Sequence, residues 1–236
     1  MRKIFSTALV AMSLCSAAVA ADDVAKLNDR VEAAHTVLHE LMDTPDKGVP
    51  LSVAAKAKCV AVIPSLKKGA FIVGAEYGQG LATCRTRRGW SAPVFIQLTG
   101  GSFGFQAGGE ATDLVLIGTN QKSMDNLLKD KVKLGGDAAA AAGPVGRDAQ
   151  ADTTELANAA FLTYSRNKGL FAGVDLTGAE VHQNTNATNQ FYGKEIPYQT
   201  ILTGGVATPA AAHHFITTVN ELFRMGRERQ AAKSGE

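Results

Sequence analysis

The stretch from residue 59 to 119 is a succession of short runs rich in β-branched and aromatic residues, separated by turns that contain glycine. In chain order the runs are CVAVIP (59–64), GAFIVGAEYG (69–78), GLATCR (80–85), WSAPVFIQL (90–98), SFGFQAG (102–108) and TDLVLIGT (112–119). Runs of this length at hairpin spacing predict an antiparallel sheet. The chain holds 24 glycines, and glycine within strands lets a sheet bend. We therefore expect a curved, mainly antiparallel, glycine-rich β-sheet of barrel-like shape.

Segments with helical periodicity lie before, within and after this region. Apolar residues recur at spacings of three and four from Val24 to Leu41, which predicts an N-terminal helix. A C-terminal helix is expected with Thr208 as its cap and Pro209 in the first helical position. The other expected elements are helices over 51–58 and 120–131 and strands over 132–145, 154–166 and 170–183. No linker divides the chain, so the predicted class is α+β in a single domain.

The first 20 residues have the features of a secretory signal peptide. Two basic residues precede an apolar run over residues 4–14, and an A-x-A cleavage site occupies residues 18–20. The run is too short to cross a bilayer as a helix. We expect cleavage after Ala20 and export to the periplasm or cell envelope of a bacterium, or secretion, without a transmembrane segment. Lipidation of Cys15 is the alternative, although Leu14 is not the small residue that precedes a lipidated cysteine.

Without this leader the chain is neutral. The full sequence has 24 basic and 22 acidic residues, and the leader carries two of the basic ones. A neutral, exported chain with no nucleic-acid fold signature argues against a nucleic-acid partner. Two cysteines remain, Cys59 and Cys84. In an oxidising compartment they form one disulfide, or they are two buried free thiols.

The segment GGSFG (100–104) matches the G-x-S-x-G pattern of a hydrolase nucleophile, with Ser102 as the serine. That role needs a strand, a sharp turn and then a helix. Alternating Phe103 and Phe105, followed by two adjacent glycines, favour a continuing strand instead. We therefore interpret the segment as a glycine-rich strand and expect no enzyme. Asp113 is interpreted as a buried, hydrogen-bonded structural acid, with a general acid as the alternative.

Histidines offer a second candidate chemistry. His35 and His39 are four residues apart, so they share a helix face that suits a metal ion. No third ligand is evident in the sequence, so we interpret them as exposed surface histidines, and likewise His213 and His214. Nucleotide-binding motifs are absent. We expect neither a metal nor a cofactor.

Basic residues outnumber acidic ones by seven to one between Leu51 and Trp90. Two basic pairs fall in predicted turns, and if both turns leave the sheet at one end they form a cationic rim. Such a rim suits phosphate headgroups, and a tryptophan beside it suits a membrane interface. Charged loops that are merely solvated are the alternative. The proposed lipid-binding residues are Lys67, Lys68, Arg85, Arg87, Arg88 and Trp90.

Several motifs together resemble the SYLF domain. They are GFQAGGEATD (104–113), LGGDAAAAAGPVGR (134–147), TYSRNKGLFAGVDLTG (163–178) and NQFYG (189–193), with AKCVAVIP, GAFIVGAEYGQG and GWSAPVFI upstream. The resemblance covers about residues 51–193, within a single domain expected over 21–236. It implies that the family-signature positions keep the fold: Gly104, Gly108, Asp113, Gly143, Gly146, Arg147, Lys168, Gly169 and Gly173.

The resemblance also implies lipid binding without catalysis. Eukaryotic members bind phosphoinositide-containing membranes through a basic amphipathic helix, and some bind actin filaments. Here the N-terminal helix is rich in acidic residues, so that contact does not carry over, and actin is not expected as a partner in a cell envelope. We therefore expect a phospholipid- or anionic-membrane-binding envelope protein. The alternatives are a structural or partner-binding protein that uses the apolar faces of its terminal helices, and a carrier of a small apolar ligand in a β-sheet cavity.

Overall fold

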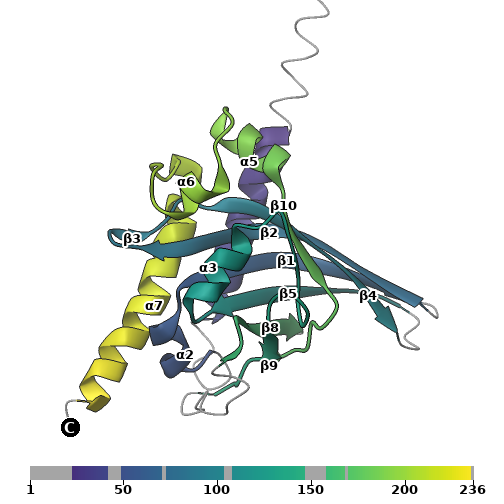
Figure 1. The fold of residues 1–236 in the computed structure, drawn as a ribbon, viewed down its shortest axis with the longest axis horizontal. Coiled ribbons are helices and arrows are strands. Elements are labelled where there is room, and N and C mark those ends of the chain that lie inside the picture. The colour runs from purple at the N-terminus through teal and green to yellow at the C-terminus, as the bar shows by residue number, and fades with distance from the viewer. Residues whose placement is uncertain are drawn as a thin grey trace, which may run out of the picture.

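The computed structural model describes residues 23–41, 49–70, 73–103, 108–146, 158–167 and 170–234. Within them one large sheet runs in the order β6-β10-β4-β2-β1-β5-β8-β7, with β3 beside β2 and β9 beside β8. All pairings are antiparallel except β7 with β8. The strands are β1 (Cys59–Ala70), β2 (Val73–Thr86), β3 (Gly89–Trp90), β4 (Val94–Phe103), β5 (Gly108–Gly118), β6 (Lys131–Lys133), β7 (Ala140–Ala142), β8 (Phe161–Asn167), β9 (Leu170–Gly173) and β10 (Glu180–Gln183). The sheet curls into a half-barrel, and the α+β prediction is confirmed (Figure 1).

The helices lie on both sides of the sheet. In Figure 1, α3 is in front of the sheet and the N-terminal helix (residues 23–41, purple) is behind it. Asn120 caps α3 as predicted, by accepting the Ser123 N–H, but the helix ends at Leu127. Pro209 precedes a 3-10 turn instead of beginning the last helix, which corrects that prediction. The labelled helices are α2 (Leu51–Lys56), α3 (Gln121–Leu127), α5 (Thr185–Tyr192), α6 (Tyr198–Leu202), η1 (Ala210–Ala212) and α7 (His213–Ser234).

The sheet separates two apolar cores. Val60 and Val62 of β1 join the core that the N-terminal helix, α2 and α7 cover. Cys59, Ala61 and Ile63 join the core enclosed by the curl of the sheet, together with α6 and residues of β6 and β10. This alternation is the period-two pattern of a strand that is buried on both faces. The long central strands are therefore held from both sides.

The apolar faces of the two terminal helices are part of the first core. Val31, Ala34 and Leu38 of the N-terminal helix are at most 1% exposed, and Phe215 and Phe223 of α7 are fully buried. Both predicted stripes are therefore real helix faces. However, they pack inside this domain, which contradicts the idea that these faces bind a partner.

A kink in β1 depends on Asp113. Ser65 has a φ of 52°, and at this point the register of β1 shifts against both of its neighbours, β2 and β5. The Asp113 carboxylate accepts the Ser65 N–H at 3.0 Å and lies 3.3 Å from Arg166 Nη1. Arg166 also pairs with Glu40 of the N-terminal helix. Asp113 is thus hydrogen-bonded as expected and is also ion-paired, but its side chain is 22% exposed and not buried, which corrects that part of the prediction.

Two signature glycines are required by close packing. A Cβ on Gly143 would lie 2.2 Å from Cζ of the Tyr164 ring, and a Cβ on Gly173 would lie 2.3 Å from the Gly143 carbonyl oxygen. Neither approach leaves room for a side chain. Gly146 has a φ of 105°, and Gly108 pairs with Ala70. The other signature positions, Gly104, Arg147, Lys168 and Gly169, lie outside the described residues, as do the leader and Cys15.

A disulfide joins β1 to β2. Cys59 and Cys84 face each other in the antiparallel register, with their Cα atoms 4.0 Å apart. The two sulfurs are bonded, and both residues are fully buried. Of the two alternatives that the sequence left open, the structure has the bonded pair.

Candidate anion-binding cleft

The residues predicted to form one cationic rim occupy opposite ends of the β1–β2 pair. Lys67 and Lys68 lie within β1, opposite Tyr77 and Glu76, and not in a turn as predicted. Arg85 lies eight residues further along β2 than Tyr77, about 26 Å away at the usual rise of a strand. Figure 1 shows the far ends of β1, β2, β4 and β5 extending away from β3. The single rim is therefore wrong, because the kinked β1 continues as a strand through the lysine pair.

The lysine end is also partly neutralised. Lys68 Nζ lies 3.3 Å from the Glu76 carboxylate across the strand pair, while Lys67 is exposed. Opposite charges at directly paired positions of an antiparallel sheet stabilise the pairing. The ion pair with Glu76 thus gives Lys68 a structural role, and Lys67 is the exposed member of the pair.

The arginine end opens into a cleft of about 600 Å³. We call it the cationic cleft, and its lining residues are Lys58, Arg85, Thr86, Arg87, Arg88, Gln121, Met124 and Thr203. They come from the residue before β1, the end of β2, the β2–β3 turn, α3 and the residue after α6. Four of the eight are cationic and none is acidic.

Arg85 is held at the inner side of this cleft. Its Nε donates to the Ala57 carbonyl at 3.0 Å, and its guanidinium carbon lies 4.8 Å from the centroid of the Trp90 ring. Burial, and then the nearby charge of Arg227, lower the pKa of Arg85, but a guanidinium remains charged at neutral pH. Its Nη2 is buried and has no hydrogen-bond partner among the described residues. A buried charged donor of this kind favours an anion as its partner.

Trp90 cannot serve at a membrane interface in this arrangement. The residue is 7% exposed, and its ring centroid lies 4.8 Å from that of Phe223 in α7. It therefore supports Arg85 from within the first core. The sequence placed Trp90 at the surface because it follows the arginine turn, but in β3 its side chain faces the helices.

The β2–β3 turn presents the other two arginines. Thr86 Oγ1 accepts the Arg88 N–H at 3.2 Å, which fixes the turn. Arg88 donates from Nη2 to the Gly204 carbonyl at 3.1 Å and so links the turn to the end of α6. Arg87 and Arg88 are both exposed. Their charges are therefore available at the mouth of the cleft.

Among the residues that the structure describes, no acidic side chain neutralises the cleft. In the described part of the chain, no carboxylate lies within ion-pair distance of Lys58, Arg85, Arg87, Arg88 or Arg227. Several like charges gathered without a counter-charge repel one another, and a bound anion relieves that repulsion.

Sequence reasoning missed Lys58, Gln121, Met124 and Thr203. Lys58 was counted among the excess of basic residues but was not assigned to the site. Gln121, Met124 and Thr203 come from elements far along the chain, and their residue types carry no signal of their own. Only the packing of α3 and α6 beside the end of β2 brings them to the cleft.

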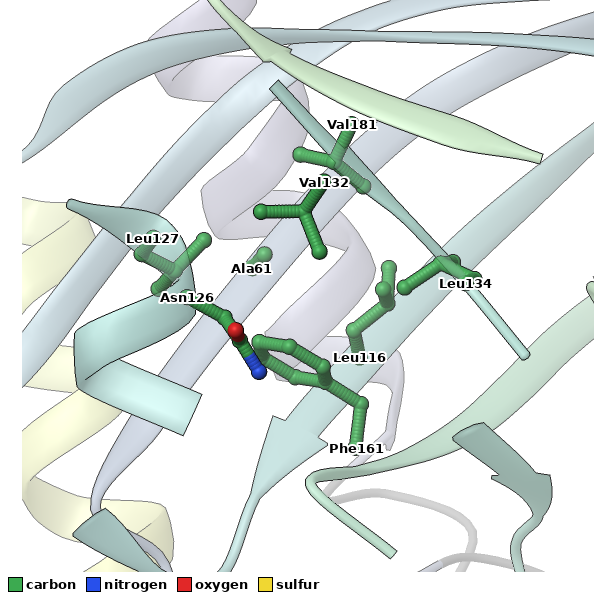
Figure 2. A pocket seen from close by; sticks show the side chains of 8 residues that line it. All are labelled: Ala61, Leu116, Asn126, Leu127, Val132, Leu134, Phe161 and Val181. Atoms are coloured by element: carbon green, nitrogen blue, oxygen red, sulfur yellow. The ribbon is translucent and has the colours of Figure 1, made fainter. Parts of the chain in front are cut away.

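The curl of the sheet encloses a second, much smaller cavity. Its volume is about 10 Å³, room for at most a single water molecule. Figure 2 shows the Phe161 ring against the amide of Asn126, with Val132 and Val181 closing the other side. This cavity is too small for a lipid chain, so it gives the carrier alternative no support.

The remaining candidate chemistries gain no support from the geometry. Ser102 lies in β4, paired with Gly74 of β2, and the next element that the structure describes is the strand β5 and not the helix that a nucleophile elbow requires. Within the described segments, no group of three or more His, Cys, Asp or Glu side chains lies so that it could hold a metal ion. None of the described helices has the length and hydropathy needed to cross a bilayer.

Comparison with known proteins relates the chain to a family of binding proteins. The family model described as "Ysc84: Las17-binding protein actin regulator" matches residues 99–222. The match continues past residue 193, where the resemblance read from the sequence ended, and into α7. The resemblance to the SYLF domain is thereby confirmed.

Individual relatives support the same relationship. SH3 domain-containing YSC84-like protein 1 of Rattus norvegicus is 34% identical over 204 residues, which cover 80% of this chain and 60% of the rat protein. The Homo sapiens protein of that name is 37% identical over 170 residues, covering 71% and 49%. LAS seventeen-binding protein 3 of Saccharomyces cerevisiae is 35% identical over 188 residues, covering 78% and 39%. The chain thus spans about two fifths to three fifths of the length of these relatives.

Proposed function

Because the chain belongs to the Ysc84 (SYLF) family, we propose that it acts by binding, and that its cationic cleft binds the phosphate of an anionic phospholipid. The observation that carries the proposal is the cleft itself, in which four cations gather with no acidic lining residue. Arginine suits this task because its planar fork binds phosphate oxygens in a bidentate manner. Arg85 supplies an inner donor, and Arg87 and Arg88 supply exposed ones at the mouth.

The size of the electrostatic attraction is sufficient for surface binding. A Lys or Arg near an anionic membrane contributes about 1 kcal/mol. Lys58, Arg87 and Arg88 are exposed, so together they supply about 3 kcal/mol before Arg85 or any direct contact is counted. The N-terminal helix does not take part through its apolar face, because that face is buried. If the leader is removed as the sequence predicts, the site of action is the cell envelope.

Co-sedimentation with vesicles tests this function. Phosphatidylglycerol-containing and pure phosphatidylcholine vesicles are compared at low and high salt, with inorganic phosphate added at matched ionic strength in a further arm. Binding that requires the anionic lipid and weakens with salt supports the proposal. Binding abolished by phosphate but not by the same ionic strength of chloride assigns the site to the phosphate group. Absence of binding to every vesicle overturns the lipid proposal.

A protein partner is the second candidate. The family model and the yeast relative are named for binding Las17, and the family model also for regulating actin. These names count against the expectation that actin is not a partner of this chain. The apolar faces of the terminal helices are buried, so such a partner would bind a polar surface. Retention of this chain on immobilised actin filaments, with no binding to vesicles, would favour this second function.

A further inference from the structure

The cationic cleft is lined by neutral hydrogen-bonding groups as well as by cations. Thr86, Gln121 and Thr203 supply two hydroxyls and one amide to the same lining as Arg85. The volume of the cleft, about 600 Å³, falls in the range of clefts that take a whole small molecule. A lone phosphate group would leave much of that volume to water. A ligand that fills the cleft therefore has a phosphate and a further polar part.

Two of the neutral groups have already committed their protons. The Thr203 hydroxyl donates to the Gln199 carbonyl at 2.7 Å. The Gln121 side-chain amide donates from Nε2 to the Asp125 carboxylate at 3.3 Å and to the Met124 sulfur at 3.6 Å. A hydroxyl oxygen and an amide oxygen keep their acceptor lone pairs when such bonds are made. What Thr203 and Gln121 offer a ligand is therefore a pair of hydrogen-bond acceptors.

The charge of the lining decides which donor suits these acceptors. Hydroxyl and ammonium groups can both donate to them, but an ammonium group would enter a cleft with four cationic lining residues and be repelled by them. Asp125 is not among the lining residues, and its carboxylate already accepts from Gln121. A neutral hydroxyl meets no such repulsion. The cleft thus suits a phosphate that carries hydroxyl groups beside it.

We infer that the cleft recognises the phosphate ester of a small polyol, of the kind that forms the glycerol headgroup of phosphatidylglycerol. The inference rests on the proposed function, to which it adds the chemistry of the group beyond the phosphate. The cationic side chains hold the phosphate oxygens by charge-assisted hydrogen bonds. Gln121 Oε1 and Thr203 Oγ1 accept the headgroup hydroxyls, and Met124 supplies an apolar side chain suited to the carbon atoms of the polyol.

The first test compares phosphatidylglycerol with phosphatidylserine, which has the same net charge but carries an ammonium group. Each lipid is mixed at the same mole fraction into phosphatidylcholine vesicles, and binding of the full chain is measured by co-sedimentation. We expect the wild type to bind the phosphatidylglycerol vesicles about three- to tenfold more tightly, because only this headgroup can donate hydroxyl groups to the two acceptors without placing a cation among cations.

A double variant asks whether the two acceptors carry this preference. Gln121→Met/Thr203→Val removes both acceptors and should bind the two kinds of vesicle equally. The matched control is Gln199→Met/Thr200→Val, which makes the same two replacements at exposed positions of α6 outside the cleft lining. The control should keep the wild-type preference. A preference that persists in the Gln121→Met/Thr203→Val variant would contradict the assignment of these acceptors.

A soluble headgroup tests the wild type without a membrane and without any substitution. Glycerol phosphate and inorganic phosphate are titrated by calorimetry at matched ionic strength. Binding of glycerol phosphate about threefold or more tighter than that of inorganic phosphate supports the inference. Equal affinities for the two, or equal binding of the wild type to phosphatidylglycerol and phosphatidylserine vesicles, would overturn the inference and leave the proposed function in place. Binding of glycerol phosphate without binding to any vesicle would instead overturn the lipid function and assign the polyol phosphate to a soluble source.

Discussion

The guanidinium of Arg85 lies over the indole ring of Trp90, 4.8 Å from its centroid, and the ring of Phe223 in α7 also lies 4.8 Å from that centroid. A charged residue of the cleft is therefore supported directly by the apolar core. Cation–π contacts of this kind stabilise a desolvated guanidinium by about 2 kcal/mol. The position of Arg85 in the cleft thus depends on the packing of a helix that lies more than 120 residues later in the chain.

Trp90 is the only tryptophan in the chain, so its fluorescence reports on this packing directly. We expect a blue emission maximum, weak quenching by acrylamide, and no further blue shift when anionic vesicles are bound, because the ring is already buried. A vesicle-dependent blue shift would contradict the buried placement. Trp90→Ala should lower the free energy of unfolding by about 3–5 kcal/mol, as measured by urea denaturation.

Gly143 lies so close to Tyr164 that it should not tolerate a methyl group. In Gly143→Ala the new Cβ would meet the Tyr164 ring, and we expect a loss of about 2–3 kcal/mol in the free energy of unfolding. Gly136→Ala is the matched control, because its Cβ would lie 3.5 Å from the flexible Lys133 side chain. Equal stability of the two variants would mean that Gly143 is not required by packing.

Two buried tyrosines should respond in opposite ways to loss of the hydroxyl group. The Tyr164 hydroxyl is buried with no hydrogen-bond partner among the described residues, so Tyr164→Phe should be neutral or stabilising by up to about 1 kcal/mol. Tyr198 donates to the Phe95 carbonyl and lies 3.0 Å from the Thr188 hydroxyl. Tyr198→Phe should therefore cost about 1–2 kcal/mol. Thermal unfolding of both variants measures the difference, and the reverse order would refute the assignment.

We also expect the burial of Tyr198 to make the folded protein less stable at alkaline pH. Burial raises the pKa of Tyr198 to about 12, against about 10 in an unfolded chain. The raised pKa means that the folded state keeps its proton after the unfolded state has lost it. The stabilisation of the folded state that comes from this raised pKa is fully present below about pH 10 and is lost as the pH rises toward 12. Urea midpoints measured across this range should fall more steeply in the wild type than in Tyr198→Phe, and parallel curves would contradict the shift.

Much of the fold was predictable because it follows from repeating patterns. The apolar stripes that contain Leu38 and Phe215 identified both terminal helices, and alternating residues such as Val60 and Ala61 identified a strand with two buried faces. Asn120 was expected to cap a helix, and it is the N-cap residue of α3. These signals lie within a few residues of the elements they specify, so a single sequence is enough to read them.

The cleft was predicted only in part, because its geometry depends on distant contacts. The kink at Ser65 is held by Asp113, which lies 48 residues away and cannot be paired with it from the sequence alone. Without that contact, Lys67 and Lys68 look like a turn beside a glycine. Trp90 likewise looks exposed until α7 is placed against β3. The arginines were identified correctly as basic residues in a turn, but their partners in space were not.

The most direct test of the cationic cleft compares two double variants that remove the same charge from opposite ends of β1–β2. Arg87→Ala/Arg88→Ala should weaken binding to phosphatidylglycerol-containing vesicles by about 30-fold, from about 1 kcal/mol per charge, and should reduce its dependence on salt. Lys67→Ala/Lys68→Ala should bind like the wild type, once thermal unfolding has shown that both variants are folded. Loss of binding in the lysine variant alone, or an equal loss in both, would contradict the cleft as the binding site.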